Sequence, residues 1–466
     1  MAEEAKGGDF FDGIIEWLAE KIEHFIHPDD THHKPDFIHQ MVSKVGGWGI
    51  SRGLFLCVIF IALNATAAGL FPVYPRLVVG WLILGLPVIG PVGLIAGFYK
   101  AWLWYVQSLY IFQRTKPMLL EVRMPADVFK SPRAMEQVIT GFWIRSGVTT
   151  FIDRLWNGGV LPYFAFELVS IGGQVHFFIW TRGMYKNALE ATFYAQYPEV
   201  EILEVEDYAS HFVYSPDAYD NHAAEFAYTK SDAYPIKTYV DFELDRDPKE
   251  ELKVEPFAQV LETLSMIGKD EQAWVQIVLR GAFGGVQTLW EDRVKEEVNK
   301  IRKEMTLSGE NGDAGAKFPR PAWRQQEQLK VMERNLAKLP FEVGMRLLYW
   351  APRGKSQSPH ISAIRNLWRP FDNQAYQNRI SATRGHSVFD FPWQDWNGVR
   401  SRLTTRRYLD AYRRRMFFHT PWITPTQVVT TEVLATLFHP PSRTVRSPGL
   451  QRIATSKAEP PVNLPT

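Results

Sequence analysis

The chain has 466 residues, of which 46% are apolar and 14% aromatic, so it contains enough apolar side chains for two or three packed domains. The charges of its 52 basic and 51 acidic residues nearly cancel, which excludes a strong overall electrostatic field. A charged partner would therefore be recognised by a local cluster of charged side chains. The single cysteine, Cys57, excludes a disulfide framework.

The first fifty residues form a polar arm. Within it, residues 10–27 (FFDGIIEWLAEKIEHFIH) repeat apolar side chains at helical spacing with carboxylates between them, which predicts an amphipathic helix that contacts a protein partner. Five histidines follow closely and offer possible ligands for a transition metal. Without cysteine or a fixed ligand spacing they favour a solvated linker, and we expect no metal site. These histidines are His24, His27, His32, His33 and His39.

Two uncharged runs, residues 54–71 and 77–98, come next. At about 1.5 Å per residue each is long enough, or nearly so, to cross a hydrocarbon core of roughly 30 Å. They predict a transmembrane hairpin over residues 51–113. A signal peptide would need its apolar run nearer the start. A buried hairpin in a water-soluble protein remains open, because glycine and proline between Gly85 and Gly93 weaken a lone helix.

The residues around these runs predict how the hairpin would lie. Basic side chains precede the first run and follow the second, which predicts a multi-pass protein of the cytoplasmic (inner) membrane with both termini in the cytoplasm and lipid as a partner. Aromatic side chains just after the second run are typical of a membrane interface. The predicted interface residues are Trp102, Trp104, Tyr105 and Tyr110.

Residues 117–207 predict a domain of alternating strands and helices. A strand (118–124) precedes a helix with Ser131 as its N-cap and Pro132 at its first position. Two strands (163–171 and 174–180) flank a Gly-Gly turn, which is a strong hairpin signal. A helix from Met184 to Gln196 and a strand (200–205) complete a strand–helix–strand–strand–helix–strand order, which is that of a ferredoxin-like unit.

The same order of types is expected again over residues 236–395. Its strands are predicted at 238–244, 273–279, 340–349 and near 388–391, and its helices at 256–266 and 360–371. Residues 289–338 interrupt it with two charged helical stretches that predict a helical hairpin, either solvated or packed on a partner. The expected fold class is therefore α+β: a transmembrane helical hairpin followed by two tandem ferredoxin-like domains, the second with a helical insertion.

Residues 396–466 form a basic segment with a proline-rich tail. From residue 391 to the last residue, the sequence has eleven Lys and Arg side chains but only four Asp and Glu side chains. Arginines lie among tyrosines and phenylalanines, a mixture that nucleic-acid-binding proteins use but that lipid, an acidic protein or solvent also explains. The residues expected to meet an anionic partner are Arg406, Arg407, Arg413, Arg414 and Arg415.

The sequence lacks the common catalytic motifs. The stretch SGENGDAGAK has glycines and a lysine but not the spacing of a phosphate-binding loop. The sequence contains no G-x-S-x-G, H-E-x-x-H or C-x-x-C motif either. We therefore expect a protein that is not an enzyme and has no cofactor. A third hypothesis is a membrane enzyme of unknown chemistry, which no set of catalytic residues in the sequence supports.

Several long strings resemble a known group of proteins. MLLEVRMPADVFKSPRAMEQVI, FAFELVSIGGQVHFFIWT, NALEATFYAQYPEVEILEV, TTEVLATLFHPP and KAEPPVNLP are similar to a membrane-anchored module associated with type IV secretion and conjugative DNA-transfer ATPases of bacteria. In such proteins the last two strings stand just before a nucleotide-binding motor domain, whereas this sequence stops at Thr466. No catalytic residue is therefore carried over.

The resemblance implies a non-catalytic, membrane-anchored structural component or adaptor that docks a motor ATPase at the cytoplasmic membrane face, and we also expect a homo-oligomer. A membrane-tethered nucleic-acid-binding module, with DNA as a partner, is the alternative. The residues expected to contact the motor are Thr431, Glu432, Leu434, Leu437, Phe438, Lys457, Pro460 and Pro461.

Overall fold

The computed structural model describes residues 61–62, 64–66, 69, 73–125, 130–145, 150–246, 255–307, 322–373, 375–385, 393–442, 449–450 and 452–453. The chain divides into two compact units, Met1–Gly97 with Ser387–Arg400, and Phe98–His386 with Ser401–Thr466. The second unit contains the whole sheet and all of the sites discussed below.

One helix, α4 (Tyr74–Leu109), contains the whole second uncharged run and continues past it, with Pro87 and Pro91 inside. A π-helical turn, η1 (Tyr110–Arg114), follows it. Within the part of the chain that the structure describes, no helix has the length and apolar character needed to span a membrane. The predicted transmembrane hairpin and the multi-pass inner-membrane location are therefore wrong, although most of the first run lies outside the described residues.

The last turns of α4 show why the aromatic pattern misled. Leu103 and Val106 are buried in the folded unit. The indole of Trp102 donates a hydrogen bond of 2.8 Å to the carbonyl of Leu155, at the end of the short helix α6 (Phe151–Leu155), and its ring meets Trp156 edge-on. Aromatic side chains at a helix end serve packing on a protein as well as contact with lipid, and their spacing does not distinguish the two uses.

The first half of the sheet forms as its sequence predicts. Ser131 precedes α5 with Pro132 at its first position, and Gly172 and Gly173 join two strands with φ of 59° and 85°. Two positive φ values suit the tight turn that a right-twisted hairpin needs. The elements are β1 (Pro117–Pro125), α5 (Pro132–Thr140), β2 (Phe164–Ile171), β3 (Gln174–Arg182), η2 (Gly183–Tyr185), α7 (Lys186–Gln196), β4 (Glu201–Val205) and α8 (Tyr208–His211).

The second half departs from prediction at its first and last strands. Its first strand is β5 (Tyr219–Tyr228), not residues 238–244, and its last is β8 (Ile380–Gly385); the stretch predicted near 388–391 lies outside the described residues. The remaining elements are α9 (Phe257–Ser265), β6 (Gln272–Gly281), α10 (Gly285–Leu307), α11 (Trp323–Leu336), β7 (Pro340–Pro352), α12 (Ser358–Arg365), η4 (Arg369–Phe371), η5 (Trp396–Gly398), α13 (Val399–Arg413), β9 (Gln427–Thr430), α14 (Thr431–Leu437) and β10 (Arg452–Ile453).

Residues 238–244 form turns because local hydrogen bonds compete with the strand pattern. The Thr238 carbonyl accepts from the backbone of Asp241 and Phe242, and the Asp241 carboxylate accepts from the Thr238 amide at 3.0 Å. Threonine and aspartate favour such local bonds, which offer the backbone an alternative to a sheet ladder. The alternating TYVDFEL pattern therefore gave the wrong element.

The described strands form one ten-stranded sheet in the order β10-β1-β3-β2-β6-β7-β5-β8, with β4 beside β1 and β9 beside β7. All of these pairs are antiparallel except β1 with β10. Strands β2 and β6 pair from Phe164 opposite Leu279 to Ile171 opposite Gln272, so the sheet is continuous from one half to the other. The predicted fold class of a transmembrane hairpin plus two tandem ferredoxin-like domains is therefore wrong, and the folded unit is a mixed α+β structure around a single sheet.

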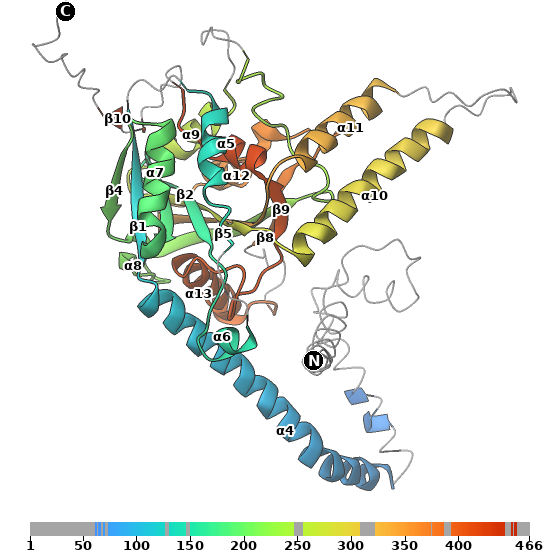
Figure 1. Cartoon of the computed structure of the whole chain (residues 1–466). Coiled ribbons are helices and arrows are strands. Elements are labelled where there is room, and N and C mark those ends of the chain that lie inside the picture. Colours follow the sequence, from blue (N-terminus) through green and yellow to red (C-terminus); the bar gives the residue numbers. More distant parts are fainter. Residues whose placement is uncertain are drawn as a thin grey trace, which may run out of the picture. The chain divides into compact units, whose positions relative to one another are not determined.

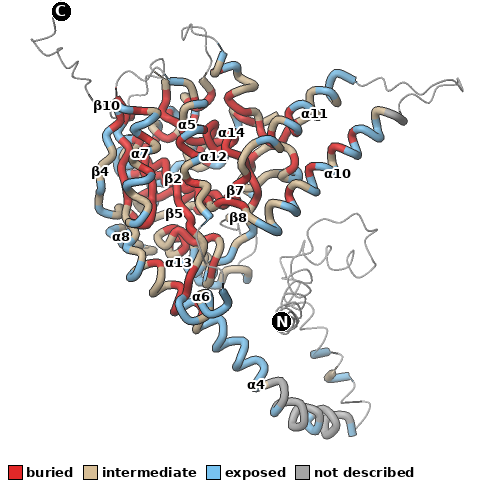
Figure 2. The backbone as a smooth tube through the Cα atoms, viewed as in Figure 1, coloured by how far each residue is buried: buried red, intermediate tan, exposed pale blue. Residues whose placement is uncertain are grey.

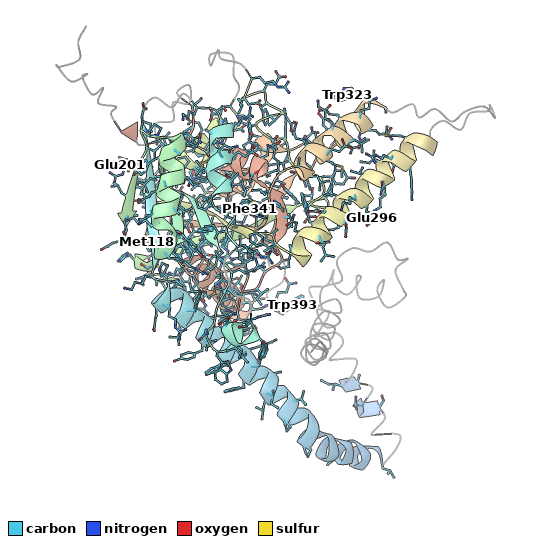
Figure 3. All side chains as sticks on the ribbon, in the orientation of Figure 1. Met118, Glu201, Glu296, Trp323, Phe341 and Trp393 are labelled. Carbon is cyan, nitrogen blue, oxygen red and sulfur yellow. The ribbon has the colours of Figure 1, made fainter. Side chains whose placement is uncertain are left out.

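Helices cover both faces of this sheet. On one face the core packs strand side chains, among them fully buried Phe341, against α5, α7, α9, α12 and α14. On the other face α8, α13 and η1 cover Trp180, Trp274 and Trp350. The buried residues form the interior of the unit in Figure 2, and Figure 3 places Phe341 among densely packed side chains.

The two charged helices predicted in the insertion, α10 and α11, pack on each other (Figure 1). Their shared apolar core contains Trp290, Val294 and Met332 and includes Val428 of β9. Arg302 and Glu333 form an ion pair of 3.0 Å between them. The insertion is thus a helical hairpin that is anchored on the folded unit at β9.

Candidate functional site

A row of polar side chains crosses the middle of the sheet on the face that α13 covers. Glu167 of β2 lies opposite Gln276 of β6, Gln276 opposite Arg346 of β7, and Arg346 opposite Glu225 of β5. The first three are fully buried and Glu225 is 8% exposed. Burying charged groups costs several kcal/mol each unless they are paired and hydrogen-bonded. This polar row is therefore the least expected feature of the core.

Hydrogen bonds connect the members of the polar row. Gln276 Nε2 donates to Glu167 Oε1 at 2.8 Å, and Arg346 Nη1 donates to Gln276 Oε1 at 3.5 Å. Arg346 also donates to the Met416 carbonyl at 2.8 Å, lies 3.5 Å from a Glu225 oxygen, and packs over the Phe417 ring. Burial lowers the pKa of Arg346 to about 10, and Glu225 opposes that shift. The row is well paired at Glu167 and less completely at Arg346.

Arg415 covers the Glu167 end of the row and is itself fully buried. Its Nε and Nη2 donate to the two oxygens of Glu167 at 2.9 and 3.2 Å. Its Nη1 and Nη2 donate to the two oxygens of Asp207, which precedes α8, with Nη2 at 3.0 Å. Burial alone would lower the pKa of Arg415, but Glu167 and Asp207 raise it well above its ordinary value. One guanidinium thus joins the sheet, α8 and the end of α13.

The end of α13 brings Arg415 to this position. The Arg415 amide donates to the Tyr412 carbonyl and the Met416 amide donates to the Ala411 carbonyl, both at 3.0 Å. This is the pattern of a Schellman motif, in which the residue after the helix adopts a left-handed conformation, and Arg415 has φ 52°. Glycine usually occupies this position, because other residues pay roughly 1–2 kcal/mol there. The ion pairs of Arg415 hold it in a conformation that its side chain disfavours.

Two tyrosines complete the cluster. The Tyr208 hydroxyl donates to Glu167 Oε2 at 2.8 Å and lies 2.6 Å from the Tyr412 hydroxyl. Burial raises the pKa of both tyrosines well above the ordinary value, and the Glu167 carboxylate adds to that shift. Both hydroxyls therefore stay protonated at neutral pH. The cluster is suited to holding α8 and α13 on the sheet rather than to transferring protons.

A cleft of about 550 Å³ opens beside this cluster. One part of its wall is apolar, with Phe112, Met118 and Trp180. The other part is charged and is formed by Asp207, Ser210, Asp410, Arg413, Arg414 and Arg415. Concave sites with an apolar wall and a few convergent polar groups are the default candidates for binding. We refer to this site as the arginine cleft.

The structure separates the five arginines predicted for an anionic partner. Arg415 is buried in the ion-pair cluster. Arg413 donates to the backbone carbonyls of Ala209 and Phe212, and Arg414 pairs with Asp410 at 2.8 Å and packs over Phe112. These three line the arginine cleft, but internal contacts engage all of them.

Arg406 and Arg407 have a different environment. Both are exposed on α13, and Arg407 packs over the ring of Trp422. Trp422 in turn donates its indole N–H to Asp410 at 2.7 Å. The outer surface of α13 thus exposes Arg406 and Arg407, beside Arg400 and Arg402 nearer its start, on a helix whose end is fixed by Arg415.

The residues predicted to contact a motor ATPase lie elsewhere. Thr431, Glu432, Leu434, Leu437 and Phe438 are all buried in β9–α14 and its junction with the core. Leu434, Leu437 and Phe438 belong to the core on the helix-rich face of the sheet. They cannot form a partner surface while the unit is folded, and their prediction as motor contacts is replaced by a role in packing. Lys457, Pro460 and Pro461 lie outside the described residues.

Glu432 has internal partners that explain its burial. It accepts a hydrogen bond of 2.6 Å from Thr238 Oγ1 and lies 3.1 Å from Arg334 Nε of α11. Burial raises the pKa of Glu432, while Thr238, Arg334 and Lys338 oppose that shift. This carboxylate therefore ties the α10–α11 hairpin to the core.

The four aromatic residues predicted at a membrane interface divide between half-buried and exposed positions. Trp102 packs on α6 as described above, and Tyr110 lies beneath the guanidinium of Arg182. Trp104 and Tyr105 are exposed. The described residues include no helix that could span a membrane, and the assignment of these four to a membrane interface stays a prediction.

No cluster of three or more His, Cys, Asp or Glu side chains suited to a metal ion occurs in the described ranges. The histidine-rich stretch between His24 and His39 lies outside those ranges.

Sequence reasoning missed the polar row and Asp207. A signal for Glu167 was present, because it is the only charged residue in the apolar strand FAFELVSI, and a charge inside such a run is rarely buried unless it is paired. Its partners could not be named, since Gln276, Arg346 and Arg415 become neighbours only through the register of the sheet and the docking of α13.

Two solved structures of berberine bridge enzyme variants are each 11% identical to this chain with a TM-score of 0.20, one described as a reticuline dehydrogenase and the other in complex with (S)-reticuline. The matches cover 70% of this chain but only 55% and 54% of those chains, about half their length. A similarity this weak carries no argument about fold or function. No curated protein matches the sequence. A family described as a domain of unknown function (DUF8128) matches residues 113–451, and the chain belongs to this family.

Proposed function

We propose that this protein is a non-catalytic adaptor of a type IV secretion-like transfer machine, and that the exposed face of α13 docks it on an acidic surface of a motor ATPase. The proposal combines the resemblance of its strand and helix strings to a transfer-ATPase module with the placement of its arginines. The observation that carries it is the pair Arg406 and Arg407, exposed on a helix that buried ion pairs fix to the sheet.

Rigid presentation is what makes this pair suitable for docking. A flexible basic tail loses conformational entropy when a partner orders it, whereas a helix held at its end by Arg415 has lost that entropy in folding. Arginine is enriched at interface hot spots, where its planar guanidinium can donate two parallel hydrogen bonds to a carboxylate in a fixed geometry. The apolar wall of the arginine cleft adds surface for a partner's apolar side chain beside the charged contacts.

Nucleic acid is the alternative partner, and the internal contacts of the cleft argue against it. Nucleic-acid binding draws on many free cations for counterion release. Arg413, Arg414 and Arg415 are engaged with carbonyls or carboxylates, and Asp410 adds a negative charge to the same helix. With Asp410 on the same helix, the exposed arginines of α13 suit a local acidic patch on a protein better than a phosphate backbone.

The test is the affinity of the full chain for the motor ATPase encoded nearest to its gene. Charge reversal with Arg406→Glu and Arg407→Glu should weaken binding at least tenfold, because two charge-assisted contacts are removed and two repulsive ones replace them. The matched control is Lys295→Glu with Lys300→Glu, two exposed lysines on α10, which should leave the affinity unchanged.

A second titration uses labelled single-stranded DNA with the same variants. If DNA binds with a steep dependence on salt, and the α13 reversals abolish that binding while leaving ATPase binding intact, the nucleic-acid function replaces the adaptor. Equal affinity of the reversed and unreversed chains for the ATPase would refute docking through α13.

A further inference from the structure

A groove of about 350 Å³ lies between helix α12 and β8, the last strand of the sheet. The α12 residues that line it recur at helical spacing, which places them on one side of the helix. Ser381 and Ala382 of β8 form the other wall. We refer to this site as the α12–β8 groove, and none of its residues belongs to the arginine cleft. The α12 residues are Ser358, Ile361, Ser362, Arg365 and Asn366.

The groove is accessible to solvent and has an apolar floor. Its lining residues on α12 are exposed except Ile361, which, like Ala382, is half-buried and packs against the core on the helix-rich face of the sheet. A ligand in the groove would therefore cover apolar surface at Ile361 and Ala382 and meet polar side chains along the rim.

The strand in this wall has an open edge. Among the described strands, β8 pairs only with β5 and ends the sheet. The amide of Thr229, just after β5, donates to the carbonyl of Arg379, just before β8. In an antiparallel pair every second residue bonds to the partner strand, so Ser381 turns its backbone to β5 and Ala382 turns its backbone away. Such open backbone groups are a template for pairing with another strand.

Arg365 is the only charged side chain that lines the groove. It is exposed, and in the part of the chain that the structure describes no carboxylate pairs with it. The nearby Asp372 does not line the groove and has Arg369 and Arg379 as charged neighbours. The groove thus presents one positive charge without a counterpart, which favours an acidic occupant.

We propose that the α12–β8 groove binds an extended segment of a partner protein, which adds a strand to β8 and places an aspartate or glutamate on Arg365. In this mode of recognition, backbone hydrogen bonds provide affinity and alternate side chains provide specificity. Every second side chain of the added strand would face the apolar floor at Ile361 and Ala382. The inference does not depend on the proposed docking through α13.

Two other occupants fit the groove less well. A second copy of this chain would bring another arginine and no carboxylate from its own groove. A terminal carboxylate is usually captured by a nest of backbone N–H groups, whereas Arg365 lies at the end of α12, where a helix presents carbonyl groups. An internal acidic side chain on an extended segment is the better match.

Peptide selection on the full chain tests the proposal without knowledge of the partner. The probe is a phage-displayed library of random eight-residue peptides that are fused at their C-terminal ends, so a terminal carboxylate cannot contribute. At least one enriched group should carry an aspartate or glutamate among β-branched residues. Failure to enrich any acidic peptide would overturn the proposal.

Titration of synthetic copies of the enriched peptides, followed by fluorescence polarisation, locates the binding. Arg365→Glu should weaken it at least tenfold, and exchanging the acidic residue of the peptide for lysine should restore affinity for that variant. The matched control is Arg133→Glu, an exposed arginine of α5 outside the groove, which should leave the affinity unchanged. If Arg365→Glu binds every acidic peptide as tightly as the wild-type chain does, the proposal fails.

Methylation of peptide nitrogens distinguishes an added strand from other modes of binding. Because a strand bonds its neighbour through every second residue, methylating one alternate set of amides should weaken binding at least tenfold and methylating the other set should have little effect. Equal losses from both sets, or a loss from neither, would exclude strand addition.

A substitution that fills the groove provides the last check. Ser362→Trp adds a large side chain at an exposed position of α12 and should weaken peptide binding at least tenfold. Sedimentation velocity of this variant and the wild-type chain tests the second copy as occupant. A concentration-dependent dimer that Ser362→Trp abolishes would mean that a second copy fills the groove, and the proposal would be wrong.

Discussion

Replacing Arg415 by methionine tests the buried cluster under α13 most severely. The change keeps an unbranched side chain of similar length but removes all five hydrogen bonds of the guanidinium, including those to Glu167 and Asp207. Glu167 would remain fully buried beside Gln276 and Tyr208 without its cationic partner. Breaking a buried pair in this way costs about 3–5 kcal/mol, a large part of a total stability of about 5–15 kcal/mol.

Urea unfolding followed by tryptophan fluorescence measures this cost. Linear extrapolation gives the free energy of unfolding of the wild-type chain and the Arg415→Met variant. The surface control is Arg407→Met, which loses only an exposed contact with Trp422 worth about 0.5–1 kcal/mol. A double variant with Glu167→Gln should lose less than the sum of the single losses, because both changes remove one interaction. If Arg415→Met costs no more than Arg407→Met, the cluster does not hold α13 on the sheet.

Three further predictions concern single positions. Gly344→Ala should lower the free energy of unfolding measured in urea by about 1–3 kcal/mol, because its new methyl would lie 2.2 Å from the Phe417 ring. The control is Gly285→Ala, whose methyl would have nothing within 4 Å and which should be neutral or slightly stabilising. Arg415→Gly should be about 1 kcal/mol more stable than Arg415→Ala, since φ is 52° there, and equal stabilities would contradict the left-handed helix end. Burial raises the pKa of Asp372 from 3.8 to about 6, so its contribution to stability is present below pH 3.8 and lost as the pH rises through 6. The free energy of unfolding of Asp372→Asn should therefore exceed that of wild type by up to roughly 1 kcal/mol at pH 7.5, after allowance for partial exposure of the side chain, and should equal it at pH 4. An equal gain at both pH values would exclude this explanation.

Local signals in the sequence were reliable where few competing interactions act. The Gly172-Gly173 turn and the Ser131-Pro132 helix start were both confirmed, because each depends on backbone conformations that these residues prefer on their own. The strand predicted at 238–244 failed because Asp241 and Thr238 close a turn with their own backbone. The strand β5 was missed, since DNHAAEFA mixes charges with apolar residues and becomes a strand by pairing with β7 and β8.

The two incorrect fold predictions have a common cause. Aromatic residues at a helix end suit a membrane interface or packing on a protein, and for Trp102 only its contacts with Leu155 and Trp156 distinguish the two. A repeated order of strands and helices suits two domains or one sheet, and only the pairing of β2 with β6 distinguishes these. Both decisions depend on contacts between distant residues, which one sequence does not contain.

The candidate sites show the same limit. The arginines of α13 were recognisable as a basic run, but their separation into buried Arg415, engaged Arg413 and Arg414, and exposed Arg406 and Arg407 follows from how the helix ends and packs. The α12–β8 groove had no signal in the sequence, because its two walls, residues 358–366 and 381–382, come together only in the folded unit.

Hydrogen–deuterium exchange of the full chain, alone and saturated with the motor ATPase, tests the central claim most directly. Slowed exchange on binding should be confined to α13 and its surroundings at Phe112 and Trp422, where exposed arginines and the arginine cleft lie. Protection confined to the α10–α11 hairpin, with α13 unchanged, would contradict docking through the basic face of α13.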